Sequence, residues 1–263
     1  MRILFLGDIV GSIGISAASD FLPLIRNEKR IDFVIANGEN ATKGKGLSKE
    51  DYEKISSFAD AITLGNHYRS QYEIDRFIGD ADKLVRPLNL LHYHKGEGSK
   101  VFYVNDIPVR VTNLLGAAFM NETVKSPIQV MEELEPSFEE PIHIVDYHAE
   151  STSEKQIFAY YFDGAFTAVI GTHTHVATLD ARILPNGTAY QSDAGFCGSY
   201  ESIIGFDVET TIERIVFEKG KLIVPPEGKK VVYGTIIEID ENTFKPISIE
   251  PICYLEGKES RHG

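Results

Sequence analysis

The sequence predicts an α/β fold in which two packed β-sheets carry helices on their outer sides. Apolar runs alternate with helical patterns over the first third of the chain, and later runs are rich in β-forming residues. The chain has 263 residues, of which 43% are apolar, and this is enough for a substantial core. Because no linker, low-complexity segment or internal repeat interrupts it, we expect one domain over residues 1–263.

The first third of the chain repeats a unit of strand, loop and helix three times. Its apolar runs, each typical of a buried strand, are residues 2–6, 31–36 and 61–64. We expect Ser12 to cap a helix that runs to about Asn27. Ser48 should begin the next helix, since Asp51 stands three residues later in a capping-box position. Repeated units of this kind build parallel strands, whose functional loops lie at the carboxyl ends.

The rest of the chain favours strands and antiparallel pairing. Residues 105–108 and 185–187 are predicted hairpin turns, and Asn186-Gly187 is a strong turn signal. Ser153 is expected to start a helix through Phe162, and the polar tail 258–263 should be frayed. The runs predicted to form strands are residues 101–103, 109–112, 142–147, 166–170, 181–184, 188–191, 222–224, 231–239 and 247–252.

Charge and cysteine content restrict the class of protein. The formal net charge of −13 disfavours binding to long nucleic acid, but a small nucleotide held by metal ions remains compatible with it. The two cysteines, Cys197 and Cys253, form no disulfide framework and fit a reducing cytoplasm. Gly7-Asp8 ends the first apolar run too early for a signal peptide, and no apolar run is long enough to span a bilayer. We therefore expect a cytoplasmic protein without membrane contact.

Five of the predicted strands are followed by polar tips that are rich in metal-binding residue types. The strongest signal is Gly171-Thr172-His173-Thr174-His175, because histidines two residues apart face one side of an extended segment. The other tips carry Asp8, Glu39 with Asn40, Asn66 with His67, and His148. Each alone has an ordinary alternative, such as a helix cap, a solvated charge or a hydrogen-bonded structural histidine. Together they predict one metal centre.

The residue types indicate which metals this centre would bind. Carboxylates, amide oxygens and imidazoles without a thiolate suit manganese, iron or zinc, and there are too many of them for one ion. Two ions in such a site lie about 3.5–4 Å apart and clamp the attacking and leaving oxygens of an in-line displacement. This is the chemistry of phosphoester hydrolysis.

In this order the motifs resemble those of the YmdB-like family of calcineurin-like metallophosphoesterases. The segments that carry the resemblance are Gly7-Asp8-Ile9-Val10-Gly11, Asn37-Gly38-Glu39-Asn40-Ala41, Gly65-Asn66-His67, His148-Ala149-Glu150-Ser151-Thr152-Ser153-Glu154-Lys155 and Gly171-Thr172-His173-Thr174-His175-Val176. The resemblance covers essentially the whole chain. It implies a four-layer α/β/β/α sandwich of two mixed sheets flanked by helices, a bacterial source, and two divalent or trivalent ions, typically iron or manganese.

The resemblance also implies a role for each matched residue. The implied ligands of one ion are Asp8, Glu39, Asn40 and His175. Those of the other ion are Glu39, Asn66, His148 and His173, so that Glu39 bridges the two. His67 resembles the family's catalytic histidine and would assist the leaving group, while a hydroxide that bridges the ions attacks phosphorus. The implied reaction converts 2′,3′-cyclic nucleotides to 3′-nucleotides. Whether the chain forms a homo-oligomer is left open.

Two segments depart from the family pattern. Tyr68-Arg69-Ser70 stands where the family has a Trp-Asp pair, and Phe196-Cys197 lies in a segment that usually reads Asp-Val-Gly-Met. We expect neither to touch an implied ligand, but both to affect base preference and rate. Arg69 either contacts phosphate or is a solvated surface residue. The alternative functions are a phosphatase or nuclease on the same centre, or a regulatory protein whose metal site is structural.

Overall fold

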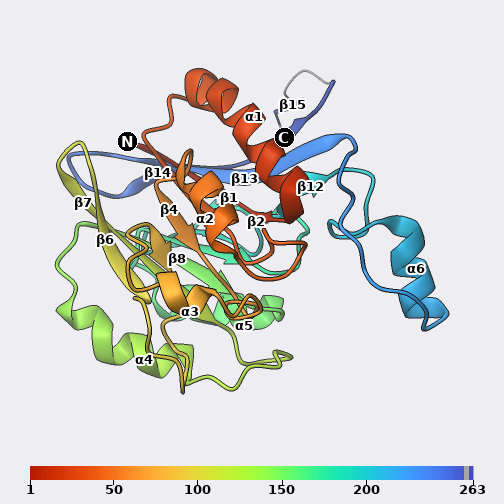
Figure 1. Cartoon of the computed structure of the whole chain (residues 1–263). Coiled ribbons are helices and arrows are strands. Elements are labelled where there is room, and N and C mark those ends of the chain that lie inside the picture. The colour runs from red at the N-terminus through yellow and green to blue at the C-terminus, as the bar shows by residue number, and fades with distance from the viewer. Residues whose placement is uncertain (258–260, 263) are drawn as a thin grey trace.

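A computed structural model describes residues 1–257 and 261–262 of the chain. Two β-sheets pack against each other, and helices cover their outer faces (Figure 1). The predicted α/β fold and the four-layer α/β/β/α arrangement are therefore confirmed. Of the tail 258–263, for which the sequence predicts fraying, residues 258–260 and 263 lie outside the described residues, whereas Arg261–His262 pair with a neighbouring strand, so the prediction is wrong for these two. Within the described part of the chain, every helix is too short or too polar to cross a membrane.

The first sheet has a parallel part and an antiparallel part. The parallel strands, in spatial order, are β1 (Arg2–Leu6), β3 (Phe33–Asn37), β4 (Ala61–Thr63) and β5 (Leu84–Val85). The antiparallel part beside β1 consists of β13 (Lys230–Ile239), β14 (Pro246–Leu255) and β15 (Arg261–His262). Beyond the end of β1, β13 pairs with the short strand β12 (Phe196–Ser199), and β12 pairs in parallel with β2 (Asp8–Ile9).

The second sheet is parallel at its centre and has a hairpin at each side. Its strands, in spatial order, are β10 (Arg182–Ile183), β11 (Ala189–Gln191), β9 (Ala168–Thr172), β8 (Ile142–His148), β7 (Ile107–Leu115) and β6 (Ser99–Val104). The two predicted hairpins are present as β6–β7 and β10–β11. The turn of the first is shorter than predicted, because Asn105 and Asp106 both adopt positive φ and Ile107 already belongs to β7.

Alternating side chains of the strands build the layers. In β1, Leu4 and Leu6 pack toward the helices, whereas Ile3 and Phe5 pack toward the second sheet. The helices on the first sheet are α1 (Gly11–Lys29) and α2 (Lys49–Ser56). Those on the second sheet are α4 (Pro127–Leu134), followed by the short η1 (Glu135–Ser137), and α5 (Thr152–Tyr161). The remaining helices are α3 (Ile74–Phe77) and α6 (Val208–Val216), and α6 stands apart from both sheets (Figure 1).

Several local predictions need correction. The Ser12 cap is wrong, since α1 begins at Gly11 and no side chain caps it. The helix predicted from Ser153 begins one residue earlier, because the Ser151 hydroxyl accepts the cap hydrogen bond from the Glu154 N–H. The Ser48 cap is confirmed, but the reciprocal half of the capping box is not formed, because the Ser48 N–H donates to Thr42 Oγ1 instead of the Asp51 carboxylate. Residues 222–224 form no strand, because they follow α6 as an extended segment without a neighbouring strand.

Candidate metal centre

The polar tips of both sheets meet at one edge of the molecule. β1, β3 and β4 run parallel in the first sheet, and β8 and β9 run parallel in the second, so the tips that follow them lie together where the sheets face each other. Each of the eight residues predicted for the centre lies in this group and contacts another member of it. Gly65 permits the close approach, because a Cβ there would lie 2.2 Å from Glu39 Oε2 and 2.4 Å from His148 Nε2.

His148 is at the middle of the larger cluster. It ends β8 and is fully buried. Its Nε2 lies 3.1 Å from Glu39 Oε1, 3.0 Å from Asn66 Oδ1 and 3.0 Å from His173 Nδ1. Glu39, His148 and His173 each offer one ligand atom, and these three atoms lie within 4.8 Å of one another. Four donor groups from four loops thus face one small volume.

Asp8, Asn40 and His175 form a second cluster beside the first. His175 Nε2 lies 3.0 Å from Asn40 Nδ2 and 3.7 Å from Asp8 Oδ1. The Asn40 amide also donates to Glu39 Oε1 at 3.3 Å, so Glu39 contacts both clusters. The Asn40 Nδ2 faces the cluster, and coordination through Oδ1 would require this amide to turn over. The backbone carbonyl of Ile204 lies 2.7 Å from His175 Nδ1 and leaves Nε2 directed at the cluster.

Two observations test whether these residues fit metal ions. Asp8 is fully buried, yet its Oδ1 has no hydrogen-bond partner among the described residues. A buried carboxylate oxygen without a partner is costly unless a cation compensates it. In the larger cluster, acceptor atoms of Glu39 and Asn66 point at the same nitrogen of His148. The donor set and the unpaired oxygen both fit hard or borderline metal ions.

The pKa values of His148, Glu39 and Asp8 also indicate that this group of carboxylates favours a positive charge nearby. Burial alone would lower the pKa of His148, but the Glu39 carboxylate outweighs burial and raises that pKa to about 9. Burial would raise the pKa of Glu39, yet His148 lowers it to about 2. Burial raises the pKa of Asp8 to about 6. Without a metal ion, the cluster therefore retains a proton on His148 in neutral solution.

A buried layer of polar residues beneath His148 fixes its ring. His148 Nδ1 lies 2.8 Å from Thr172 Oγ1, and this hydroxyl donates to Asp146 Oδ1 at 2.7 Å. Asn37 donates to the other Asp146 oxygen at 3.0 Å and accepts the Glu39 N–H at 3.1 Å. The sequence interpretation missed this layer. The signal was available, because Asp146 is a carboxylate within a strand that is otherwise mostly apolar.

His67 and Glu150 lie at the open side of the centre. The backbone N–H of His67 donates to Glu39 Oε2 at 2.9 Å. His67 is partly exposed, and its ring Nδ1 lies 3.5 Å from Asn66 Nδ2. Burial lowers the pKa of His67. Glu150, which is half-exposed, lies 3.0 Å from His173 Nε2. His173 therefore has Nδ1 directed at the cluster and Nε2 paired with a carboxylate.

The two segments that depart from the family pattern lie in different surroundings. The expectation that neither touches an implied ligand is wrong for Phe196, whose ring stacks on that of His175 with centroids 5.9 Å apart. Arg69 is exposed, as expected of a surface residue, and it forms an ion pair there. Its Nη2 donates to Asp75 Oδ2 at 2.6 Å, and its guanidinium lies 5.6 Å from the centre of the Tyr93 ring.

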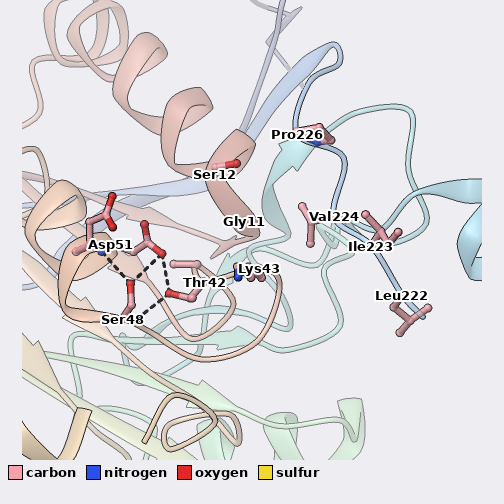
Figure 2. A pocket seen from close by; sticks show the side chains of 12 residues that line it. Gly11, Ser12, Thr42, Lys43, Ser48, Asp51, Leu222, Ile223, Val224 and Pro226 are labelled. Carbon is pink, nitrogen blue, oxygen red and sulfur yellow. Dashed lines mark hydrogen bonds between the residues drawn. The ribbon is translucent and has the colours of Figure 1, made fainter. Parts of the chain in front are cut away.

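A cavity of about 600 Å³ lies beside the start of α1 and contains none of the predicted ligands (Figure 2). One wall is formed by the extended segment that follows α6, and the opposite wall by the loop after Asn40. In Figure 2 the hydroxyls of Thr42 and Ser48 both turn to the Asp51 carboxylate, at 2.7 and 3.1 Å. These groups satisfy one another, so the cavity lacks the converging donors of the metal centre.

Several known proteins are similar to this chain in sequence or in fold. The family model described as YmdB-like protein matches residues 4–252. A 2′,3′-cyclic-nucleotide 2′-phosphodiesterase of Bacillus subtilis is 43% identical over 255 residues, which are 96% of each chain. The crystal structure of a phosphatase from Mycoplasma pneumoniae has 38% identity and a TM-score of 0.90 over 97% of this chain and 93% of that one. The calcineurin-like phosphoesterase YfkN of Bacillus subtilis shares the fold, with 12% identity and a TM-score of 0.55 over 100% and 93%. The chain belongs to the YmdB-like protein family and has the calcineurin-like phosphoesterase fold.

Proposed function

We propose that this protein is a metal-dependent phosphodiesterase with two ions at the candidate centre. The observation that carries the proposal is the convergence of Glu39, Asn66 and His173 on His148 Nε2, beside the unpaired Asp8 Oδ1. The buried carboxylates of Asp8 and Glu39 in this set cost stability unless cations bind there. Because relatives of this chain are phosphoesterases, we infer that the reaction at the centre is hydrolysis of a phosphoester.

The ligand assignment follows the two clusters. One ion would be held by Asp8, Glu39, Asn40 and His175. The other would be held by Glu39, Asn66, His148 and His173. Two bound ions would neutralise charge on a phosphodiester and activate water for attack on phosphorus. We propose iron, with manganese or zinc as the alternatives that the same ligand types accept.

The chain's own residues would orient the substrate and handle the proton of the leaving group. His67 follows Asn66, and its backbone is fixed by Glu39 at the open side of the centre. Its imidazole would donate a hydrogen bond to the leaving oxygen as negative charge develops there. The phosphodiester itself would favour the protonated ring, and this opposes the effect of burial on the pKa of His67.

The substrate class we propose is a 2′,3′-cyclic nucleotide, opened at the P–O2′ bond to leave a 3′-nucleotide. Support comes from the name of the Bacillus subtilis relative, with which this chain is 43% identical over nearly its whole length. The net charge of −13 fits a small nucleotide better than a long nucleic acid. The single domain over 1–263, the cytoplasmic location and any homo-oligomer stay predictions.

The test is hydrolysis of 2′,3′-cyclic AMP by protein purified without air exposure, with metal content measured on the same sample. About two ions per chain are expected, with turnover that falls at least about 100-fold in His67→Ala while the metal content stays the same. Parallel assays with 3′,5′-cyclic AMP and a phosphomonoester separate the proposal from a general phosphatase. Two ions without hydrolysis of any cyclic nucleotide would contradict the substrate assignment and favour the phosphatase or regulatory alternative.

A further inference from the structure

A buried ion pair outside the predicted ligand set lies behind the His173–His175 loop. Lys155 of α5 and Asp193 are both buried, and Lys155 Nζ lies 3.1 Å from Asp193 Oδ2. A buried ion pair is weak evidence for a stabilising role, because the cost of desolvating both charges offsets much of their attraction. The hydrogen bonds that this pair makes to its surroundings therefore indicate its purpose.

Those hydrogen bonds go to the two peptide groups on either side of His173. Lys155 Nζ donates to the Thr172 carbonyl at 2.8 Å, which belongs to the peptide group before His173. Asp193 Oδ2 accepts the Thr174 N–H at 2.9 Å, which belongs to the peptide group after His173. Because both flanking peptide groups are held, the φ and ψ angles of His173 are held as well.

The loop needs such support because its backbone is unusual. His173 has φ +105° and His175 has φ +61°. Residues other than glycine rarely adopt such positive φ angles. Residues in such conformations persist only where the surroundings impose them. The Thr174 hydroxyl donates a further hydrogen bond to Asp193 Oδ2 at 2.8 Å, so a single carboxylate oxygen holds the residue between the two histidines.

The same carboxylate also reaches the segment that carries Asp8. Asp193 Oδ1 accepts the Gly195 N–H at 2.9 Å, and the Gly195 carbonyl accepts the Asp8 N–H at 3.0 Å. The Asp8 side chain in turn accepts the His173 N–H at 3.2 Å. Hydrogen bonds to the backbone thus connect Asp193 with the segments that carry three proposed ligands, His173, His175 and Asp8. For the residues that the structure describes, no hydrogen bond joins Asp193 to the side chain of a ligand.

We infer that Lys155 and Asp193 are positioning residues, which hold His173, His175 and Asp8 in the arrangement that metal ions require. This inference rests on the proposed metal centre and extends it to two residues that bind neither metal nor substrate. Outer partners of metal ligands typically change metal affinity about 10–100-fold when they are removed. The pair should therefore affect metal affinity more than its effect on stability alone would explain.

The test is calorimetric titration of Mn²⁺ into the metal-free full chain, with the melting temperature of each sample measured in parallel. Lys155→Met retains an unbranched side chain that is one heavy atom shorter and removes the ammonium group. The control is Arg110→Met, because Arg110 and Glu140 form a mostly buried ion pair, at 2.7 Å, outside the centre. Both variants should melt at lower temperature. The Kd for Mn²⁺ should rise about 10–100-fold in Lys155→Met and stay within about twofold of the original value in Arg110→Met.

A second pair of variants keeps the inference testable if Lys155→Met does not fold. Thr174→Val removes the hydroxyl that bonds to Asp193, whereas Thr174→Ser retains it. The Val variant should bind Mn²⁺ several-fold more weakly, and the Ser variant should bind it as the original chain does. Equal affinity in folded Lys155→Met and the original chain, or in both Thr174 variants, would overturn the inference alone. An original chain that binds no Mn²⁺ would overturn the proposed centre and the inference together.

Discussion

The two ends of β8 carry histidines in opposite environments. His143, near the beginning of the strand, has Nε2 2.8 Å from Thr112 Oγ1, and its ring packs edge-on against Phe138 and Phe166. Burial lowers the pKa of His143 to about 3. His148, at the end of the strand, faces several acceptor groups, and its pKa is raised to about 9 by Glu39 against the effect of burial. The same residue type is thus neutral at one end and proton-binding at the other.

The ion pairs near the two ends of β8 also differ in what their charged groups contact. Arg110 Nε and Nη2 each donate to one oxygen of Glu140, at 2.7 Å, so the charges satisfy each other directly. Lys155 and Asp193, besides pairing with each other, each form a hydrogen bond with the backbone next to His173. Where polar groups satisfy one another, they support the fold. Where they converge on a common point or hold an unusual backbone, they indicate a binding site.

The largest expected difference is between His148→Ala and His143→Ala. We expect His148→Ala to reduce the affinity for Mn²⁺ by more than about 100-fold, because it removes a proposed ligand at the centre of the cluster. His143→Ala should lower the free energy of unfolding by about 1–3 kcal/mol through lost packing and a lost hydrogen bond. Its affinity for Mn²⁺ should not change. Calorimetric titration and thermal unfolding of both variants check this. Equal metal affinity in the two variants would show that His148 is not a metal ligand.

The second expected difference concerns pH. Metal ligation needs neutral imidazole, so binding should displace the proton that His148 holds below pH 9. The affinity for Mn²⁺ should then rise roughly tenfold per pH unit between pH 7 and pH 9, with about one proton released per chain. Titrations in buffers of different ionisation enthalpy measure this number. Affinity that stays constant across this range would contradict the assignment of the proton to His148.

The same pKa shifts predict opposite pH dependence of folding stability in the metal-free chain. The folded-state pKa of His148 lies above the ordinary value of 6.5, so its contribution is fully present below pH 6.5 and is lost toward pH 9. The folded-state pKa of His143 lies below 6.5, so only the unfolded chain binds this proton and stability rises between pH 3 and pH 6.5. Melting curves of each alanine variant against the original chain isolate the two contributions.

The smallest expected effect is that of Glu150→Gln. The Glu150 carboxylate lies 3.0 Å from His173 Nε2, but it is half-exposed, and a solvent-screened pair is worth about 0.2–1 kcal/mol. We expect the Kd for Mn²⁺ to rise about threefold. The effect should shrink at high salt, whereas that of Lys155→Met should persist because the buried pair is not screened. A loss as large as that of Lys155→Met would show that the outer face of His173 matters as much as its backbone.

The sequence was sufficient to predict the group of residues at the centre, because strand ends and polar tips are local features. Asp8, Glu39, His148 and His173 each follow an apolar run, and the parallel order of the strands brings such ends together. The fold class followed from the same alternation of strands and helices. These predictions depended on patterns within about ten residues, which tertiary packing did not override.

Features that depend on contacts between distant segments were not predictable in this way. Lys155 and Asp193 are 38 residues apart, and their pairing exists only because α5 packs against the sheet that carries the His173 loop. Helix α6 was missed because its β-branched residues favour strands, although its apolar residues repeat at helical spacing and Asp207 caps it. The Ser12 cap was wrong because the chain enters α1 through a turn at Gly11, which has φ +64°.

Anomalous diffraction from crystals of the Mn²⁺-loaded chain would show whether the two clusters at the carboxyl edge bind two metal ions. We expect two anomalous peaks about 3.5–4 Å apart, with Glu39 between them, one beside His148 and His173 and the other beside Asp8 and His175. Peaks elsewhere on the molecule, or none at this edge at saturating Mn²⁺, would rule out the two-metal centre.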